Sequence, residues 1–553
     1  MATFDRRTLI TLGAFGVYVL CWFFANGYYF GIADHAIHLP YLLRTMDPSY
    51  LIGDPLVDQV RYHPSYFWTV QRPLLRVMPI ETLYLLLQAL SIAVMLGGAM
   101  ALARRLHPGP HGEWVAAVTA SLVLPIHTLV ELRRTLELVV LNRTVVVGVL
   151  LYALALGASS RYHLAFLIAG LAFLIHPNSA AQVAVLLFVA AVLDRERRRA
   201  ALTGPLVFVL AASPLVVRIL MSGAAGGVPF PAPDEYWRIV RVRSSHHDFP
   251  LNWPAFQWLI LFWFFALLGA ALRYHVPRRV VPYLAGLALL CTGQVVAVEL
   301  LRVPAVQHMH LWGSLEFLCY IVAVCTAGWL VGTWEWPPRR VPAALLSAVG
   351  FAFAGLGIVR FLGVLLSLFQ RKTYREVQVP PPAWLMPALA VAVALLLRVT
   401  GQSAGFHPAL SGLPGQALVD WAREHLPPGA RVATPPTGRG PVESFRYGAR
   451  RAIVGNFRDG GEASFSLAYA LEWRARMEAL CGCDPFGERA GRRNLSANAA
   501  RVVAQGFANA DAARFRSVAS RFGATHAVTE SSAPKLDLPL EYEDAEYRLY
   551  RIE

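Results

Sequence analysis

Runs of about 20 apolar residues recur along the first 400 positions of this sequence, and they restrict the possible folds more than any other feature. An α-helix of that length crosses the hydrocarbon layer of a membrane, which is about 30 Å thick. The chain of 553 residues is 56% hydrophobic and only 15% charged, whereas soluble domains carry about 25% charged residues. Single globular cores also stop growing at about 250–300 residues. We therefore expect a polytopic α-helical membrane protein.

The spacing of the apolar runs predicts about thirteen transmembrane helices. The first run follows Arg6 and Arg7 and has no small-residue cleavage site after it, so we expect a retained anchor rather than a removed signal peptide. The predicted spans are residues 8–29, 81–103, 113–130, 142–158, 162–176, 180–193, 201–221, 255–272, 280–301, 311–333, 341–359, 360–370 and 382–399.

Short arginine runs between the spans predict the orientation of the chain. Basic residues concentrate in cytoplasmic loops, and Arg104-Arg105, Arg197 to Arg199 and Arg278-Arg279 all fall on the same side of the span count as the N-terminus. We therefore expect a bacterial inner-membrane protein with a cytoplasmic N-terminus. The net charge of +15 reflects this arginine usage, so no nucleic-acid partner is expected. Three hydrophilic segments are then predicted outside the cytoplasm: residues 30–80, 222–254 and 401–553.

The composition changes near residue 400 to that of a small soluble domain, which divides the chain into residues 1–400 and 401–553. Helical spacing alternates with short buried strands, a pattern typical of an α/β domain. Cys481 and Cys483 are too close for an ordinary bridge, and we assign them no role. The predicted helices are 417–426, 465–480 and 511–522, and the predicted strands are 431–434, 452–454, 525–529 and a final edge strand at 547–552.

The residues that directly follow the first span include Asp34, His35 and His38. If this piece is helical, Asp34 and His38 share a face, because they are four residues apart. A carboxylate there can accept a proton from an attacking hydroxyl or hold a divalent metal ion, and histidine can bind phosphate oxygens or metal. The alternative is a polar helix cap followed by interfacial histidines. No cofactor follows with certainty from this pattern.

The second hydrophilic segment contains a cationic group made of Arg241, Arg243, His246 and His247. Guanidinium groups form paired hydrogen bonds with phosphate oxygens, so this group suits a lipid-linked phosphate. An amphipathic interfacial helix with arginines among the lipid headgroups explains the pattern equally well. The run from His246 to Asp248 could bind metal, although three consecutive residues do not easily converge on one ion.

A third polar group lies near the predicted membrane boundary and includes Glu299, Arg302, Gln307, His308 and His310. Ionisable groups at membrane depth are costly and often functional. We therefore include Gln307 and His308 among the predicted substrate-binding residues. The alternative is that the members of this group pair with one another.

The loop motifs Asp47-Pro48-Ser49 and Gly53-Asp54-Pro55, after an acidic residue at the end of the first span, resemble a bacterial branch of the C-type (GT-C) membrane glycosyltransferases. Ser444-Phe445-Arg446 and Leu471 to Arg476 resemble later landmarks of that branch, so the likeness extends over most of the chain. Many members carry two acidic residues in the first loop, whereas Asp34 is followed by His35, which argues against a two-carboxylate metal site.

The resemblance implies a GT-C-like fold with an outer C-terminal domain and transfer of a sugar from a polyprenyl-phosphate carrier to an extracytoplasmic glycan, lipid or protein. Asp34 would act as the base or would orient the acceptor. The carrier phosphate is the leaving group, so no nucleotide-binding motif is required. Two alternatives remain: a transporter or flippase for a lipid or polysaccharide, and a non-catalytic membrane protein that keeps this fold.

Overall fold

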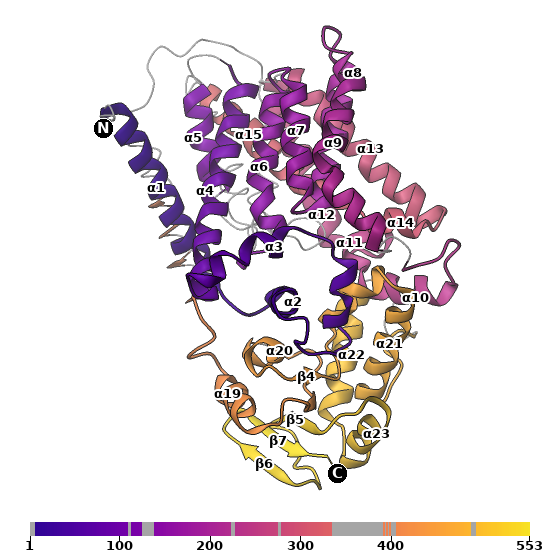
Figure 1. Cartoon of the computed structure of the whole chain (residues 1–553). Helices are drawn as coiled ribbons and strands as arrows, with labels where there is room; N and C mark the ends of the chain where they lie inside the picture. The colour runs from indigo at the N-terminus through magenta and orange to yellow at the C-terminus, as the bar shows by residue number, and fades with distance from the viewer. Residues whose placement is uncertain are drawn as a thin grey trace.

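The structure is a computed structural model, and it combines a helical bundle with a C-terminal domain at one end of that bundle (Figure 1). Residues 30–80 and 227–254, which belong to the predicted hydrophilic segments, lie between these two parts. The structure describes residues 6–108, 112–123, 138–222, 227–274, 278–333, 405–438, 440–487 and 494–552, together with 391–392, 394–395 and 398–399.

The bundle is made of apolar helices that correspond to the predicted spans. They are α1 (Arg6–Asn26), α4 (Ile80–Leu106), α5 (Gly112–Val123), α6 (Asn142–Gly157), α7 (Tyr162–Phe173), α8 (Pro177–Leu193), α9 (Ala200–Ser222), α12 (Ala255–Tyr274), α13 (Val281–Gln294), which continues as the π-helix η7 (Val295–Leu300), and α15 (Leu315–Thr333), which follows η8 (Leu311–Ser314). Each predicted span before residue 334 overlaps one of these helices.

Four helical segments of the described chain are long and apolar enough to cross a membrane: Ile80–Leu106, Ala200–Ser222, Val281–Leu300 and Pro304–Trp329. Six shorter apolar helices accompany them. These helices and the composition support a membrane protein. The predicted spans 341–359 and 360–370, and most of 382–399, lie outside the described residues, so the total of thirteen stays a prediction.

Small residues let two central helices of the bundle approach backbone to backbone. A Cβ atom added to Gly148 of α6 would lie 2.4 Å from the backbone nitrogen of Met95 in α4, and one added to Gly98 would lie 2.5 Å from the carbonyl oxygen of Gly148. Close packing of this kind is typical of membrane helices, because hydrocarbon offers no hydrophobic drive for helix association.

Hydrogen bonds place the turns of the bundle at two opposite ends. At one end the Oγ of Ser65 donates to the carbonyl oxygen of Ile175 at 2.7 Å, and the Nδ2 of Asn178 donates to that of His308 at 2.9 Å. At the other end, beside an arginine run, the Oγ of Ser160 donates to Asp194 at 2.8 Å. These contacts join turns that the arginine runs predict to lie on the same side, and the topology itself, including the side that faces the cytoplasm, stays a prediction.

The connecting segments are built from short elements at the end of the bundle that faces the C-terminal domain. The first segment contains α2 (His35–Met46), η1 (Val57–Tyr62), α3 (Phe67–Gln71) and η2 (Leu74–Arg76), and the second contains α10 (Asp234–Arg243), α11 (Ser245–Asp248) and η5 (Pro250–Asn252). The helix α14 (Pro304–Gln307) lies at the same end of the bundle. The strand β1 (Tyr28–Tyr29) pairs in parallel with β2 (Phe406–His407), which ties the end of α1 to the entry of the C-terminal domain.

The C-terminal domain has a five-stranded sheet in the order β4-β3-β5-β7-β6, with β3, β4 and β5 parallel and β7 antiparallel to both of its neighbours. Its strands are β3 (Arg431–Ala433), β4 (Ala452–Ile453), β5 (His526–Glu530), β6 (Leu540–Glu543) and β7 (Tyr547–Arg551). Its helical elements are α19 (Gln416–His425), η9 (Gly440–Val442), α20 (Phe445–Gly448), η10 (Arg458–Ser464), α21 (Leu467–Cys481), α22 (Leu495–Ala508) and α23 (Ala512–Phe522).

Alternate residues of the central strands enter two apolar cores on opposite faces of this sheet. Ala527 and Tyr550 pack in the core that includes α21, α22 and α23, whereas Val528 and Leu549 pack with α19 and α20. Successive side chains of a strand point to opposite faces of the sheet, so each strand contributes to both cores.

Two predictions for this domain are wrong. The segment 547–552 is not an edge strand, because β6, which the alternation did not reveal, pairs along it and forms the edge. Cys481 and Cys483 form a disulfide with a Cα–Cα distance of 5.3 Å, which lies within the usual range for bridged cysteines. The intervening Gly482 adopts φ +65°, and this left-handed turn brings the two side chains together.

Candidate functional site

Asp34 lies in the turn between α1 and α2, at the N-cap position of α2, but its side chain makes no capping hydrogen bond. The first backbone N–H groups of the helix, those of His35 and Ala36, donate instead to the carbonyl oxygens of Ile32 and Ala33 at 3.1 and 3.0 Å. The carboxylate therefore does not cap the start of α2, and the geometry does not support the helix-cap alternative.

A side chain from the C-terminal domain meets Asp34. The Nη1 of Arg458 lies 2.7 Å from the Oδ1 of Asp34, and its Nε lies 2.6 Å from the Oε1 of Glu443. The Oε2 of Glu443 in turn accepts a hydrogen bond from the backbone N–H of Ala33 at 3.0 Å, and the Oγ of Ser444 donates to the carbonyl oxygen of Gly31. Residues more than 400 positions away in the chain thus hold the Asp34 turn.

The charges around Asp34 keep its carboxylate ionised. Burial alone would raise the pKa of Asp34, but Arg458, His38 and Arg143 outweigh it and hold the pKa below the ordinary value. Burial raises the pKa of Glu443, against the lowering effect of Arg458. The Asp34 side chain is 42% exposed, so its carboxylate is partly accessible to a ligand.

His35 supports this turn from inside the protein. It is fully buried, its Nδ1 accepts from the backbone N–H of Gly31 at 3.0 Å, and its Nε2 contacts the carbonyl oxygen of Val140 at 3.0 Å. Burial lowers the pKa of His35 to about 3, so the ring is neutral. Both ring nitrogens are engaged by the backbone, so His35 holds the turn in this structure, and its predicted role in substrate binding stays a prediction.

His38 lies one turn further along α2, as the spacing from Asp34 predicts. Its ring packs 5.9 Å from Trp68, and its buried Nδ1 has no hydrogen-bond partner in the described parts of the chain. Burial lowers the pKa of His38 to about 4, and the charges of Asp34 and His63 act on it with opposite signs. His38 therefore keeps an unused nitrogen close to Asp34.

A second contact between the first segment and the C-terminal domain lies beside His38. The Nε2 of His63 contacts a carboxylate oxygen of Glu462, and its ring lies 4.7 Å from that of Phe465. The ring of His308 lies 5.2 Å from the same phenylalanine, and its buried Nε2 has no hydrogen-bond partner among the residues that the structure describes. Phe465 therefore connects His63 and His308, which come from different segments of the bundle end.

The two predicted phosphate-binding arginines are engaged with the protein. Arg241 pairs with Glu299 at 2.9 Å and donates to Asn252 at 3.1 Å. Arg243 donates to the carbonyl oxygens of Phe457 and Arg458 at 3.1 and 3.0 Å. Burial and the nearby Arg458 lower the pKa of Arg243 to about 10. Arg243 thus supports the backbone that carries Arg458, and it is not a free cation on an outer surface.

The remaining predicted residues form a polar group around Asp248. Gln307 is fully buried and donates to Asp248 at 2.7 Å and to Ser464 at 3.1 Å, so its amide is a structural link. Asp248 also contacts the Nδ1 of His310 at 2.7 Å. His246 and His247 lie with their ring centroids 3.9 Å apart. Glu299 pairs with Arg241, and Arg302 pairs with Asp234, so these two residues do not pair with each other.

A buried ion network joins the first segment to the C-terminal domain, and we call it the Arg446 clamp: Arg446, Asp54 and Asp459. The Nε of Arg446 contacts the two Asp54 oxygens at 2.9 and 2.8 Å, and its two terminal nitrogens contact the Asp459 oxygens at 2.9 and 2.8 Å. The clamp unites the motifs Gly53-Asp54-Pro55 and Ser444-Phe445-Arg446. Their functional importance could be suspected from the resemblance, but their contact could not.

The sequence-based prediction missed Arg458, Glu443 and Glu462. None of them lies in a motif that distinguishes it from the other charged residues of the domain, so no sequence signal marked them. In the described part of the chain, no group of three or more His, Cys, Asp or Glu residues is arranged to hold a metal ion.

Residues 414–480 match the family model of a domain of unknown function, DUF6798. No curated protein matches the sequence. Among solved structures, the chain is similar to the archaeal oligosaccharyltransferase AglB from Archaeoglobus fulgidus, in complex with an inhibitory peptide and a dolichol-phosphate, with 10% identity and a TM-score of 0.34. The alignment covers 94% of this chain and 65% of that one, so this chain spans less than two thirds of the length of that structure.

Proposed function

We propose that the protein is a membrane glycosyltransferase that transfers a sugar from a polyprenyl-phosphate carrier to an acceptor at the bundle end that carries the C-terminal domain. The observation that supports this most is the contact of Asp34 with Arg458 at 2.7 Å, directly after the first apolar helix. A reactive carboxylate and a phosphate-binding cation would then lie together at the membrane surface.

Arg458 is suited to bind the carrier phosphate. Guanidinium groups form paired, charge-assisted hydrogen bonds with phosphate oxygens. The pKa of Arg458 is raised, because Asp34 and Glu443 outweigh the effect of burial, so the group stays charged. His38 carries a buried ring nitrogen that has no hydrogen-bond partner in the described chain and that could donate to the phosphate. The other nitrogen of the neutral His308 ring bonds the Ser464 backbone, so its unpartnered Nε2 could accept from a hydroxyl of the donor sugar.

Binding of the donor would also activate Asp34. If Arg458 turns from Asp34 to the phosphate, the carboxylate loses its nearest positive charge and its pKa rises, which makes it a stronger base. The acceptor hydroxyl oxygen would attack the anomeric carbon of the sugar and give its proton to Asp34. The bond between that carbon and the phosphate oxygen would break, and the carrier phosphate would leave with the electron pair.

The structural residues have a supporting role in this scheme. Arg243 positions the backbone of Arg458, and His35 and Glu443 hold the Asp34 turn in place. We therefore assign the donor contacts to Arg458, His38 and His308, in place of Arg241, Arg243 and Gln307. His246 and His247 remain candidate ligands, and the ring of His247 lies 5.7 Å from that of His310.

The test compares two carboxylates of the first segment. Mass spectrometry of lipid-linked sugars and surface glycans, with and without the gene, first identifies the donor. In the transfer assay we expect Asp34→Asn to reduce the rate about 10²–10⁴-fold, which is typical for loss of a general base. The melting temperature should stay close to that of the wild type, since partly exposed ion pairs contribute at most about 1 kcal/mol.

The matched control is Asp47→Asn, which changes a carboxylate of the same segment that binds only Ser49 among the described side chains. This variant should keep full activity. Full activity of Asp34→Asn would show that Asp34 has no catalytic role, and the proposed mechanism would be rejected.

A further inference from the structure

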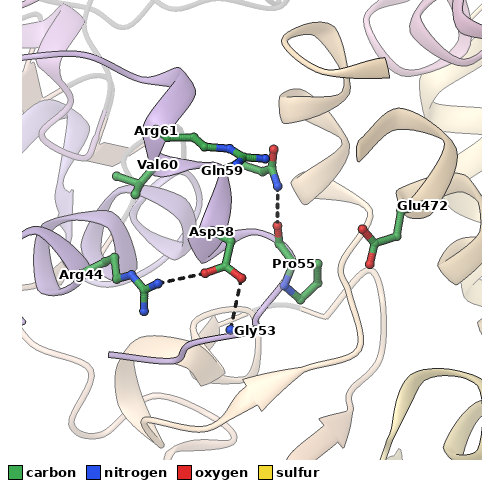
Figure 2. Close-up of a pocket in the computed structure, with 8 residues that line it drawn as sticks. All are labelled: Arg44, Gly53, Pro55, Asp58, Gln59, Val60, Arg61 and Glu472. Atoms are coloured by element: carbon green, nitrogen blue, oxygen red, sulfur yellow. Dashed lines mark hydrogen bonds and ion pairs between the residues drawn. The ribbon is translucent and has the colours of Figure 1, made fainter. Parts of the chain in front are cut away.

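A separate pocket lies at the junction between the first hydrophilic segment and the C-terminal domain. Its volume is about 550 Å³, within the range of about 300–1,000 Å³ of small-molecule sites. Figure 2 shows its walls, with residues of the first segment on one side and Glu472 of α21 on the other. The lining residues are Arg44, Gly53, Pro55, Asp58, Gln59, Val60, Arg61 and Glu472. None of them belongs to the Asp34 site.

Gln59, one of the residues that line the pocket, carries a buried hydrogen-bond acceptor with no partner in the described chain. Gln59 is only 7% exposed, and its Nε2 donates to the carbonyl oxygen of Pro55 at 3.1 Å. The Oε1 of the same amide is buried and has no hydrogen-bond partner among the residues that the structure describes. An unsatisfied buried acceptor costs about 1–3 kcal/mol. A ligand hydroxyl that reached this oxygen through a rotation of the amide would recover that free energy.

The charges that line the pocket are balanced, with two arginines against two carboxylates. Arg44 pairs with Asp58 at 3.1 Å, and Glu472 pairs with Arg476, just behind it in α21, at 2.5 Å. A phosphate or another strong anion would therefore meet two carboxylates as well as two cations. The lining favours a ligand that is polar but carries no net charge.

We propose that this pocket binds a neutral saccharide. Asp58, Gln59 and Glu472 supply hydrogen-bond acceptors for sugar hydroxyls. The exposed guanidinium of Arg61, which lies 4.9 Å from the centre of the Tyr62 ring, supplies donors. The small apolar surface of Pro55 and Val60 suits the C–H face of a sugar ring. A lipid tail does not fit such a lining, so the carrier lipid is not the occupant.

The position of the pocket indicates which saccharide it would hold. Pro55 directly follows Asp54 of the Arg446 clamp, and Glu472 belongs to the domain that supplies Arg458. A glycan bound here would contact both parts of the protein that form the Asp34 site. We assign the pocket to the acceptor glycan. This last assignment rests on the proposed function, whereas the binding of a neutral saccharide does not.

The test measures binding to the full chain in lipid nanodiscs, since sugar-based detergents would compete. The probes are maltotetraose, chitotetraose and mannotetraose, compared with galacturonate and inorganic phosphate, by saturation-transfer NMR and calorimetry. We expect at least one neutral probe to bind saturably. Gln59→Met and Arg61→Met should each weaken it at least tenfold, whereas Arg76→Met, on an exposed residue of η2 outside the pocket, should leave it unchanged.

Several results would overturn the proposal: no saturable binding of any neutral probe, binding that neither pocket variant weakens, or tighter binding of galacturonate or phosphate. Arg61 is exposed, so its substitution tests the pocket even if Gln59→Met unfolds. The Asp34→Asn variant separates the two proposals. It should bind the saccharide as the wild type does, and saccharide binding without any transfer by the wild type would refute the proposed function alone.

Discussion

Replacement of Arg446 by methionine should separate the first hydrophilic segment from the C-terminal domain. Methionine has a similar length but no hydrogen-bond donor, so Asp54 and Asp459 would stay buried without their cation. Arg446 is 2% exposed, and the two carboxylates are 0% and 3% exposed, so water cannot replace it. The change therefore tests whether the Arg446 clamp holds the two parts together.

The expected loss of stability follows from what each carboxylate keeps. Asp54 retains hydrogen bonds from the backbone N–H groups of Leu56, Val57 and Ile453, whereas Asp459 retains one from Asn456. Removal of one partner from a buried ion pair typically costs about 3–5 kcal/mol. The two pairs share one guanidinium, so their contributions do not add. We expect Arg446→Met to lower the unfolding free energy by about 3–5 kcal/mol.

The pH dependence gives a second check on this reasoning. Burial already raises the pKa of Asp459 against the effect of Arg446, and without the arginine that pKa rises further. A carboxyl whose pKa is higher in the folded than in the unfolded state stabilises the fold as the pH falls. The stability deficit of the variant should therefore shrink between pH 8 and pH 5.

Pulse proteolysis in graded urea, on the full chain in nanodiscs, measures this free energy through the fraction that resists cleavage. Arg450→Met is the matched control, since it makes the same substitution at a nearby exposed arginine and should have little effect. Adding Asp459→Asn to Arg446→Met should restore part of the loss, because one buried charge is removed. A deficit below about 1 kcal/mol at pH 8 would refute the reasoning.

Three further predictions follow. His35 is buried with a pKa of about 3, so its protonation favours the unfolded chain below about pH 6.5, and stability should fall by about 1.4 kcal/mol per pH unit. As the pH falls, the melting temperature of His35→Gln should drop less steeply than that of the wild type. A wild-type melting temperature that does not change with pH would contradict this prediction. Arg243→Met should raise the KM for the lipid-linked donor more than it lowers kcat, since Arg243 positions the Arg458 backbone; an unchanged KM would contradict this. Cysteines introduced at Ile52 and Leu540, both exposed, should react with an impermeant maleimide from the same side of the membrane, and labelling from opposite sides would reject the predicted topology.

Much of the bundle could be predicted from the sequence because membrane thickness acts locally. A membrane-spanning helix needs about 20 consecutive apolar residues, so one continuous stretch of the sequence is enough to predict it. The same holds for α19, α21 and α23, whose boundaries follow from helical spacing and caps such as Asp511, which accepts from the backbone N–H of Arg514. The location of Asp34 directly after the first apolar run is also a local property.

The partners of these residues depended on the tertiary structure. Asp34 pairs with Arg458, which is 424 positions away, and Arg446 joins Asp54 across 392 positions. Arginine is abundant in this chain, and an ion pair needs only two groups of opposite charge within about 4 Å, so spacing along the chain cannot reveal which arginine meets which carboxylate. Arg241 and Arg243 show the consequence: their sequence pattern suits a phosphate, but the fold supplies Glu299 and two backbone carbonyls first. The sequence by itself determined the apolar helices of the bundle and the helices α19, α21 and α23, but it did not reveal α22. The packing of the C-terminal domain against the bundle decided which charges stand together.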